Sequence, residues 1–234
     1  MLRILPQTAG IRYPLADVPD RAIQLRVALA EDEADYIRHA RLETLNAIGA
    51  HHHPELTAPV PYAVYLLAYE SGESRPVGMA EACFLEQHYP SYEHTPYASA
   101  CNLPAICPFP QLASIRTVFA EPGFRLRHGL YLKLILGAAH IFRSLGALYA
   151  AATTNAADER LARLYDKTGG TRIVTFKMEA FHQDDIALYL FELDALLRHP
   201  GVPRMLRDLD LSPSLLRIVR SRNRHQPSGD SAAS

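Results

Sequence analysis

The sequence has 234 residues, a formal net charge of −1 and a hydrophobic fraction of 48%. That length accommodates one domain with a sizeable core, and the hydrophobic fraction is typical of a globular protein rather than a disordered one. The near-neutral charge gives no global case for binding nucleic acid or a membrane surface. The chain has only three cysteines, Cys83, Cys101 and Cys107. An odd and small number of cysteines in a chain of this length does not indicate a disulfide framework.

The beginning of the chain, MLRILPQTAGIRYPL, lacks the apolar run and small-residue cleavage site of a secretory signal. No stretch approaches the ~18 uninterrupted apolar residues of a membrane span. We therefore expect a cytoplasmic protein with no membrane span and no nucleic-acid partner.

Hydrophobic spacing and breaker residues divide the chain into alternating strands and helices. The expected elements are, in chain order, a strand at 24–30, a helix at 31–49, strands at 62–71, 76–86 and 112–121, a helix at 129–145, a strand at 147–155, a helix at 157–170, and strands at 172–179 and 186–193. The helix at 129–145 must return the chain in one direction, so the strands on either side of it are expected to be parallel. The order predicts an α/β fold with a mixed central sheet and helices on both faces.

Composition divides the chain into four segments. We expect an N-terminal arm at 1–22, a principal domain at 23–195, a C-terminal extension of two short amphipathic helices at 196–222, and a polar, disordered tail at 223–234. Residues 87–110, rich in Pro, Tyr, Ser and His, predict an insertion within the principal domain.

The most specific pattern lies in residues 112–173. It contains ASIRTVFAEPGFR, which ends in a basic turn before the helix at 129–145, and RLARLYDKTGG, whose Leu164, Tyr165, Lys167 and Gly169 follow a Tyr-x-Lys-x-Gly pattern. The element order and these residues resemble the GCN5-related N-acetyltransferase (GNAT) superfamily, and within it the autoinducer-synthase and long-chain N-acyl amino acid synthase branch. The resemblance implies a GNAT fold and a pantetheine arm lying between the strands at 112–121 and 147–155.

Four positions depart from the superfamily pattern. His128 and Leu130 stand where its phosphate turn has small residues, Gly170 replaces a Phe, and Asn155 comes a few residues early. A bulky His128 blocks close approach of the backbone to a pyrophosphate. A carrier-protein pantetheine with one phosphodiester therefore fits this turn better than a full CoA.

The resemblance implies a set of donor-binding residues around that turn, where a helix start offers free N–H groups and a dipole that favours anions. The alternative interpretation is an ordinary solvated basic helix start. The candidate cofactor-binding residues are Phe119, Arg125, Arg127, His128, Gly129, Leu130 and Asn155.

Three further residues are candidates for the chemistry of acyl transfer. Tyr165 can protonate the leaving thiolate, or it can simply pack the short helix against the sheet. Glu81 can polarise the attacking amine, although a structural ion pair is the commoner explanation for such a residue. Arg116 lies in a strand, where an unpaired charge is costly, so it either pairs with a carboxylate such as Glu81 or orients the substrate.

A metal site is not expected. His51, His52 and His53 are consecutive residues of a proline-containing loop and cannot all point at one ion. We instead interpret this segment as a substrate-side loop.

These features predict an N-acyltransferase that moves an acyl group from a thioester, on an acidic acyl carrier protein or on CoA, to a small amine such as an amino acid or its derivative. One alternative is an acetyl-CoA-dependent N-acetyltransferase of small amines. The other is a catalytically inactive member of the fold that serves as a binding module.

Overall fold

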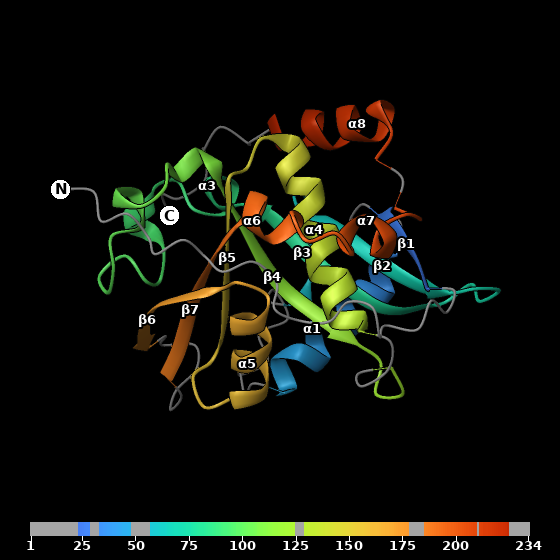
Figure 1. Cartoon of the computed structure of the whole chain (residues 1–234), viewed down its shortest axis with the longest axis horizontal. Helices are drawn as coiled ribbons and strands as arrows, with labels where there is room; N and C mark the ends of the chain where they lie inside the picture. Colours follow the sequence, from blue (N-terminus) through green and yellow to red (C-terminus); the bar gives the residue numbers. More distant parts are fainter. Residues whose placement is uncertain are drawn as a thin grey trace, which may run out of the picture.

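The computed structural model describes residues 23–28, 33–47, 57–124, 129–177, 185–209 and 211–224. Within these residues it contains one seven-stranded sheet in the order β1-β2-β3-β4-β5-β7-β6 (Figure 1). The strands are β1 (Ile23–Ala28), β2 (Val64–Glu70), β3 (Pro76–Phe84), β4 (Leu112–Ala120), β5 (Tyr149–Asn155), β6 (Thr171–Lys177) and β7 (Asp185–Glu192). The mixed α/β fold expected from the sequence is confirmed.

Helices cover both faces of this sheet. On one face α4 (Leu130–Leu145) and α5 (Glu159–Lys167) pack against the strands, and on the other lie α1 (Ala34–Ala47) and α3 (Leu85–His88). The alternation along β3 shows the division, because Ala80 and Ala82 join the core under α4 whereas Met79 and Cys83 join the core under α1. A strand covered on both sides is expected to be almost entirely apolar, and β3 is apolar at every position except Glu81.

The insertion expected at 87–110 folds over the second half of the sheet. After α3 it forms three short 3₁₀ turns, η2 (Tyr92–His94), η3 (Leu103–Ala105) and η4 (Phe109–Gln111). Leu103 and Cys107 from this segment pack with Leu188 of β7 on the α1 side of the sheet, over strands that α1 itself does not cover. The insertion is therefore a second cover for that face of the sheet.

The C-terminal region differs from the expected pair of helices. Among the described residues it contains three, α6 (Leu193–Leu197), α7 (Val202–Met205) and α8 (Pro213–Arg224), and α7 is a one-turn helix that starts after Gly201 and has Pro203 in its first turn. Their apolar side chains join the core beneath α4. Helix α6 also crosses the domain boundary expected at residue 195.

The strands β4 and β5 are parallel neighbours, as predicted, but only at their beginnings. Their pairing consists of Leu112 with Tyr149, Ala113 with Ala150, and Ser114 with Ala151. Beyond these pairs the two strands diverge, as their paths in Figure 1 show. A parallel pair of strands that separates along its length leaves room between the two strand edges.

Candidate functional site

A cavity of about 650 Å³ lies where β4 and β5 diverge. On the α4–α5 side its wall includes Tyr131, Ile135 and Tyr165, and on the α1–α3 side it includes Arg41 and His88. Since these residues come from opposite faces of the sheet, the cavity passes through the sheet. Side chains from both faces of the sheet therefore surround one common space.

Tyr165 forms part of the α5 wall of the cavity. Its ring stacks edge-on against Tyr189 at 5.1 Å and Phe191 at 5.4 Å between centroids, and only 5% of the residue is exposed. Burial raises the pKa of the Tyr165 phenol well above its usual value, so the hydroxyl keeps its proton at neutral pH. A neutral phenol on a cavity wall can donate a proton or a hydrogen bond to a ligand.

The loop after α5 explains one departure from the superfamily pattern. Asp158 caps the start of α5, because its carboxylate accepts a hydrogen bond from the backbone N–H of Leu161. A side chain on Gly170 would place its Cβ 2.7 Å from the ring of Phe191. The ring of Phe191 thus occupies the space that a Phe at position 170 would need.

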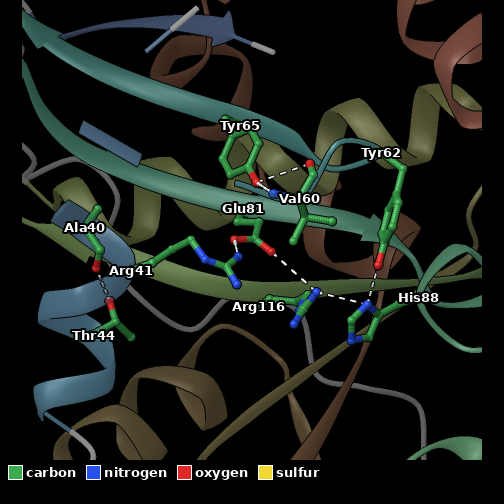
Figure 2. Close-up of polar contacts among 9 residues, drawn as sticks. All are labelled: Ala40, Arg41, Thr44, Val60, Tyr62, Tyr65, Glu81, His88 and Arg116. Atoms are coloured by element: carbon green, nitrogen blue, oxygen red, sulfur yellow. Dashed lines mark hydrogen bonds and ion pairs between the residues drawn. The ribbon is translucent and has the colours of Figure 1, made fainter. Parts of the chain in front are cut away.

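A buried group of charged residues forms the opposite wall (Figure 2). Glu81 of β3 is fully buried, and its Oε2 accepts a short hydrogen bond from Arg41 of α1. Its Oε1 lies 3.6 Å from Nη1 of Arg116 in β4. Arg41 and Arg116 line the cavity, whereas Glu81 lies behind them.

A β-bulge in β4 brings Arg116 to this wall. Ala82 pairs with Ile115 and Glu81 pairs with Thr117, so Arg116 is the extra residue between two ladder positions. Bulges re-aim side chains and increase local twist, and here the bulge directs Arg116 to the same side as Glu81. The same distortion lies at the point where β4 leaves β5.

His88, at the end of α3, completes the group. Its Nδ1 lies 3.2 Å from Nη1 of Arg116 and also contacts the hydroxyl of Tyr62. Because a guanidinium N–H can only donate, Nδ1 is the acceptor, and the hydrogen-bond network assigns the proton to Nε2. Burial, with the nearby charges of Arg116 and Arg41, lowers the pKa of His88 to about 4, so the ring is neutral at neutral pH.

The structure brings together all three predicted catalytic residues around one cavity, with Tyr165 and Arg116 on its wall and Glu81 directly behind Arg116. Glu81 takes part in a buried ion pair, one of the two interpretations that its position in the sequence left open. Their individual roles remain predictions.

The predicted donor-binding residues are more scattered. Asn155 lines the cavity, and its side chain caps the following turn by accepting from the N–H of Ala157. Gly129 precedes α4 with a left-handed φ of 58°, and Leu130 is buried at the first turn of that helix. Phe119 lies in the α1 core, 6.3 Å from the ring of Tyr36, and does not line the cavity.

The basic residues of the turn lie outside the described part of the chain. These are Arg125, Arg127 and His128. The expected phosphate contacts at this turn therefore stay predictions. The apolar strand β2 contributes no residue to the cavity wall, whereas Ala151 and Ala152 of β5 do.

Sequence reasoning missed Arg41. Arg41 is four residues after Ile37 and four before Leu45, so it occupies the apolar face of its own helix. It is only 7% exposed, and a charge on a buried helix face requires a partner. The four-residue spacing of Arg41 from Ile37 and from Leu45 could therefore have identified it in the sequence as a buried, paired charge.

Among the described residues, no three His, Cys, Asp or Glu side chains are grouped closely enough to hold a metal ion. His51, His52 and His53 lie outside those residues, so their expected lack of a metal stays a prediction. No helix in the described segments has the length and apolar character needed to cross a membrane.

No family model matches the sequence, and no curated protein matches it. Solved structures do match it. FeeM, an N-acyl amino acid synthase from uncultured soil microbes, aligns with a TM-score of 0.58 and 15% identity over 76% of this chain and 94% of its own. Arabidopsis thaliana NAA60 in complex with acetyl-CoA aligns with a TM-score of 0.55 and 12% identity over 74% of this chain and 99% of its own.

A protein from Desulfovibrio desulfuricans, assigned to the GNAT family, aligns with a TM-score of 0.51 and 18% identity over 74% of this chain and 99% of its own. At this level of identity the similarity concerns the fold. The chain therefore has the fold of the GNAT acetyltransferases, as its element order predicted.

Proposed function

We propose that this chain, which has the GNAT fold, is an N-acyltransferase that moves an acyl group from a thioester donor to the amine of a small acceptor. The observation that carries the proposal is the cavity through the sheet at the divergence of β4 and β5. It has a neutral phenol on one wall and a cluster of hydrogen-bond donors on the other. Acyl transfer requires a donor and an acceptor held at one point with a proton source beside the leaving group.

In the proposed arrangement the thioester donor approaches from the side of α4 and α5. Beyond Ser114 and Ala151 the strands no longer pair with one another, so their facing backbone edges can bind the amides of a pantetheine arm. The thioester carbonyl then lies near the bulge at Arg116. NAA60 was solved with acetyl-CoA bound, which supports a CoA thioester as one form of donor.

The amine attacks the thioester carbon, and the C–S bond breaks as the carbonyl re-forms. Tyr165, whose buried hydroxyl carries its proton at neutral pH, protonates the thiolate that leaves. Of the described residues on the cavity wall, Asp158 is the one carboxylate, and it caps α5. The amine therefore arrives as the free base or releases its proton to water.

The acceptor is a small amine such as an amino acid or its derivative. FeeM is described as an N-acyl amino acid synthase, which supports this class of acceptor. The cavity volume of about 650 Å³ lies within the ~300–1,000 Å³ of typical small-ligand pockets. A protein acceptor is not needed to account for the site.

The test measures thiol release and product mass with the full chain. The donors are acetyl-CoA, a long-chain acyl-CoA and the same long chain on an acyl carrier protein, and the acceptors are a mixture of amino acids. Formation of an N-acyl product with any donor supports the proposal, and the preferred donor identifies the carrier. Absence of product from every combination favours a binding module instead.

A second experiment tests whether the basic turn before α4 binds the phosphate of the donor. We predict that Arg125→Ala with Arg127→Ala raises the apparent donor constant about tenfold or more, because charge-assisted contacts to a phosphate are worth roughly 1.5–3 kcal/mol each when partly desolvated. The control is Arg217→Ala with Arg220→Ala, which removes two charges from α8 near the other end of α4. Equal donor constants in both double variants would show that the turn is only a solvated helix start.

A further inference from the structure

The wall formed by α1, α3 and β4 is rich in hydrogen-bond donors. Arg116 and His88 both line the cavity and contact one another at 3.2 Å. The nearest described carboxylate is Glu81, which is fully buried behind them. This part of the wall can therefore donate to a ligand much more readily than it can accept from one.

The positive charge of Arg116 is incompletely neutralised. Glu81 makes its hydrogen bond with Arg41, and its distance of 3.6 Å from Arg116 exceeds hydrogen-bond length. The Oε1 atom that faces Arg116 accepts no hydrogen bond from a described residue. Arg116 thus carries a charge, a quarter exposed toward the cavity, with no described carboxylate within hydrogen-bond distance.

His88 adds a directed neutral donor. Its Nδ1 accepts from Arg116 and Tyr62, which leaves Nε2–H as the group available to a ligand. No described residue accepts a hydrogen bond from Nε2. A neutral imidazole held in this tautomer cannot serve as a base through Nδ1, but it can donate to an anion beside the guanidinium.

We propose that this wall is the subsite for a carboxylate on the acceptor, with Arg116 supplying the charge and His88 a second hydrogen bond. This inference rests on the proposed acyl transfer and narrows its acceptors to amines that carry a carboxylate, such as free amino acids. The buried Glu81 then serves as a positioning residue, because it holds Arg41 and Arg116 without occupying the cavity.

The location assigns this subsite to the acceptor rather than to the donor. Helix α4 and the phenol of Tyr165 lie on one face of the sheet, whereas Arg41 and His88 belong to elements of the other. A donor extending from the α4 side brings its thioester to the gap. The acceptor's amine must meet it there, with its carboxylate anchored on the α1 side.

The experiment compares acceptors that differ only at the carboxylate. Phenylalanine, phenylalaninamide and phenethylamine form one set, and leucine, leucinamide and isopentylamine form a second. We expect kcat/KM about 10- to 100-fold higher for the amino acid than for the other two, the range of one charge-assisted contact. The amide has the lower amine pKa, so without carboxylate recognition it would be the better acceptor.

Variants test whether Arg116 is responsible for the preference for acceptors that carry a carboxylate. Arg116→Gln should abolish it, and Arg116→Lys, which keeps the charge beside Glu81 but loses the planar fork, should weaken it. The control Arg75→Gln removes an exposed arginine that pairs with Glu121 and does not line the cavity, so it should leave the preference intact. The wild-type comparison does not depend on whether either Arg116 variant folds.

The outcomes separate the two proposals. Equal acylation of all three members of a set overturns the carboxylate subsite while acyl transfer stands. A preference for the amino acid that survives in a folded Arg116→Gln protein overturns the assignment to Arg116. Absence of acylation with every acceptor and donor overturns both proposals.

Discussion

Replacing Tyr165 by phenylalanine separates catalysis from packing. The change removes one oxygen and keeps the ring that stacks against Tyr189 and Phe191. The structure shows no hydrogen bond from this hydroxyl to a described residue, so no protein partner is left unsatisfied. We expect the free energy of unfolding to change by less than about 0.5 kcal/mol, or about 1–2 °C in Tm.

The expected effect on turnover is much larger. If the Tyr165 phenol protonates the leaving thiolate, its loss should lower kcat about 10²- to 10⁴-fold, the usual contribution of a positioned acid. The donor should bind nearly as before, so most of the loss should fall on kcat. An aryl thioester, whose thiolate leaves without protonation, should recover most of the rate.

The assay combines thiol release under saturating donor with thermal melting of the same preparations. Tyr189→Phe is the matched control, since it removes a phenol oxygen from the same aromatic group but from a residue that does not line the cavity. Loss of stability with full activity per folded molecule would make Tyr165 a packing residue. Equal losses with alkyl and aryl thioesters would exclude its role as the acid.

Three further predictions concern the framework of the site. Glu81→Gln should destabilise the protein by about 3–5 kcal/mol in urea denaturation, because it leaves the buried guanidinium of Arg41 and the partly buried one of Arg116 without the carboxylate between them; an unchanged midpoint would contradict this. In Gly137→Ala the new Cβ would lie 2.4 Å from Cδ2 of Leu66, so overpacking by about 1–3 kcal/mol should outweigh a helix-propensity gain of about 1 kcal/mol. The destabilisations of Gly137→Ala and Leu66→Ala should then be less than additive, whereas simple addition would argue against the contact. The pKa of His88 is lowered from 6.5 to about 4 in the folded protein. As pH falls from 6.5 to 4, the unfolded chain therefore binds a proton at this residue that the folded protein does not bind, and the free energy of unfolding should fall by about 1–3 kcal/mol. A His88→Asn protein with the same pH dependence as wild type in that window would refute the assignment.

The sequence by itself determined the elements and their order. Period-2 and period-3.6 patterns, together with Gly and Pro breakers, located every strand of the sheet to within a few residues. The crossover helix between β4 and β5 required those strands to be parallel, and they are. These features are local or follow from chain direction, so they can be inferred without knowing which residues meet.

The C-terminal helices show where local patterns become insufficient. Short segments around Gly201 and Pro203 carry too few residues for a periodic pattern, so the division into α6 and α7 was not anticipated. Their boundaries depend on packing beneath α4 rather than on propensity.

Only the tertiary structure decided which charges share the cavity. Arg41, Glu81, His88 and Arg116 come from a helix, a strand, a short helix and a bulged strand, and no sequence spacing links them. The sequence identified Glu81 and Arg116 as candidates and left two roles open for each. Their roles depend on burial and on distances across the sheet, because a charge excluded from water is governed by whichever partner the fold places beside it.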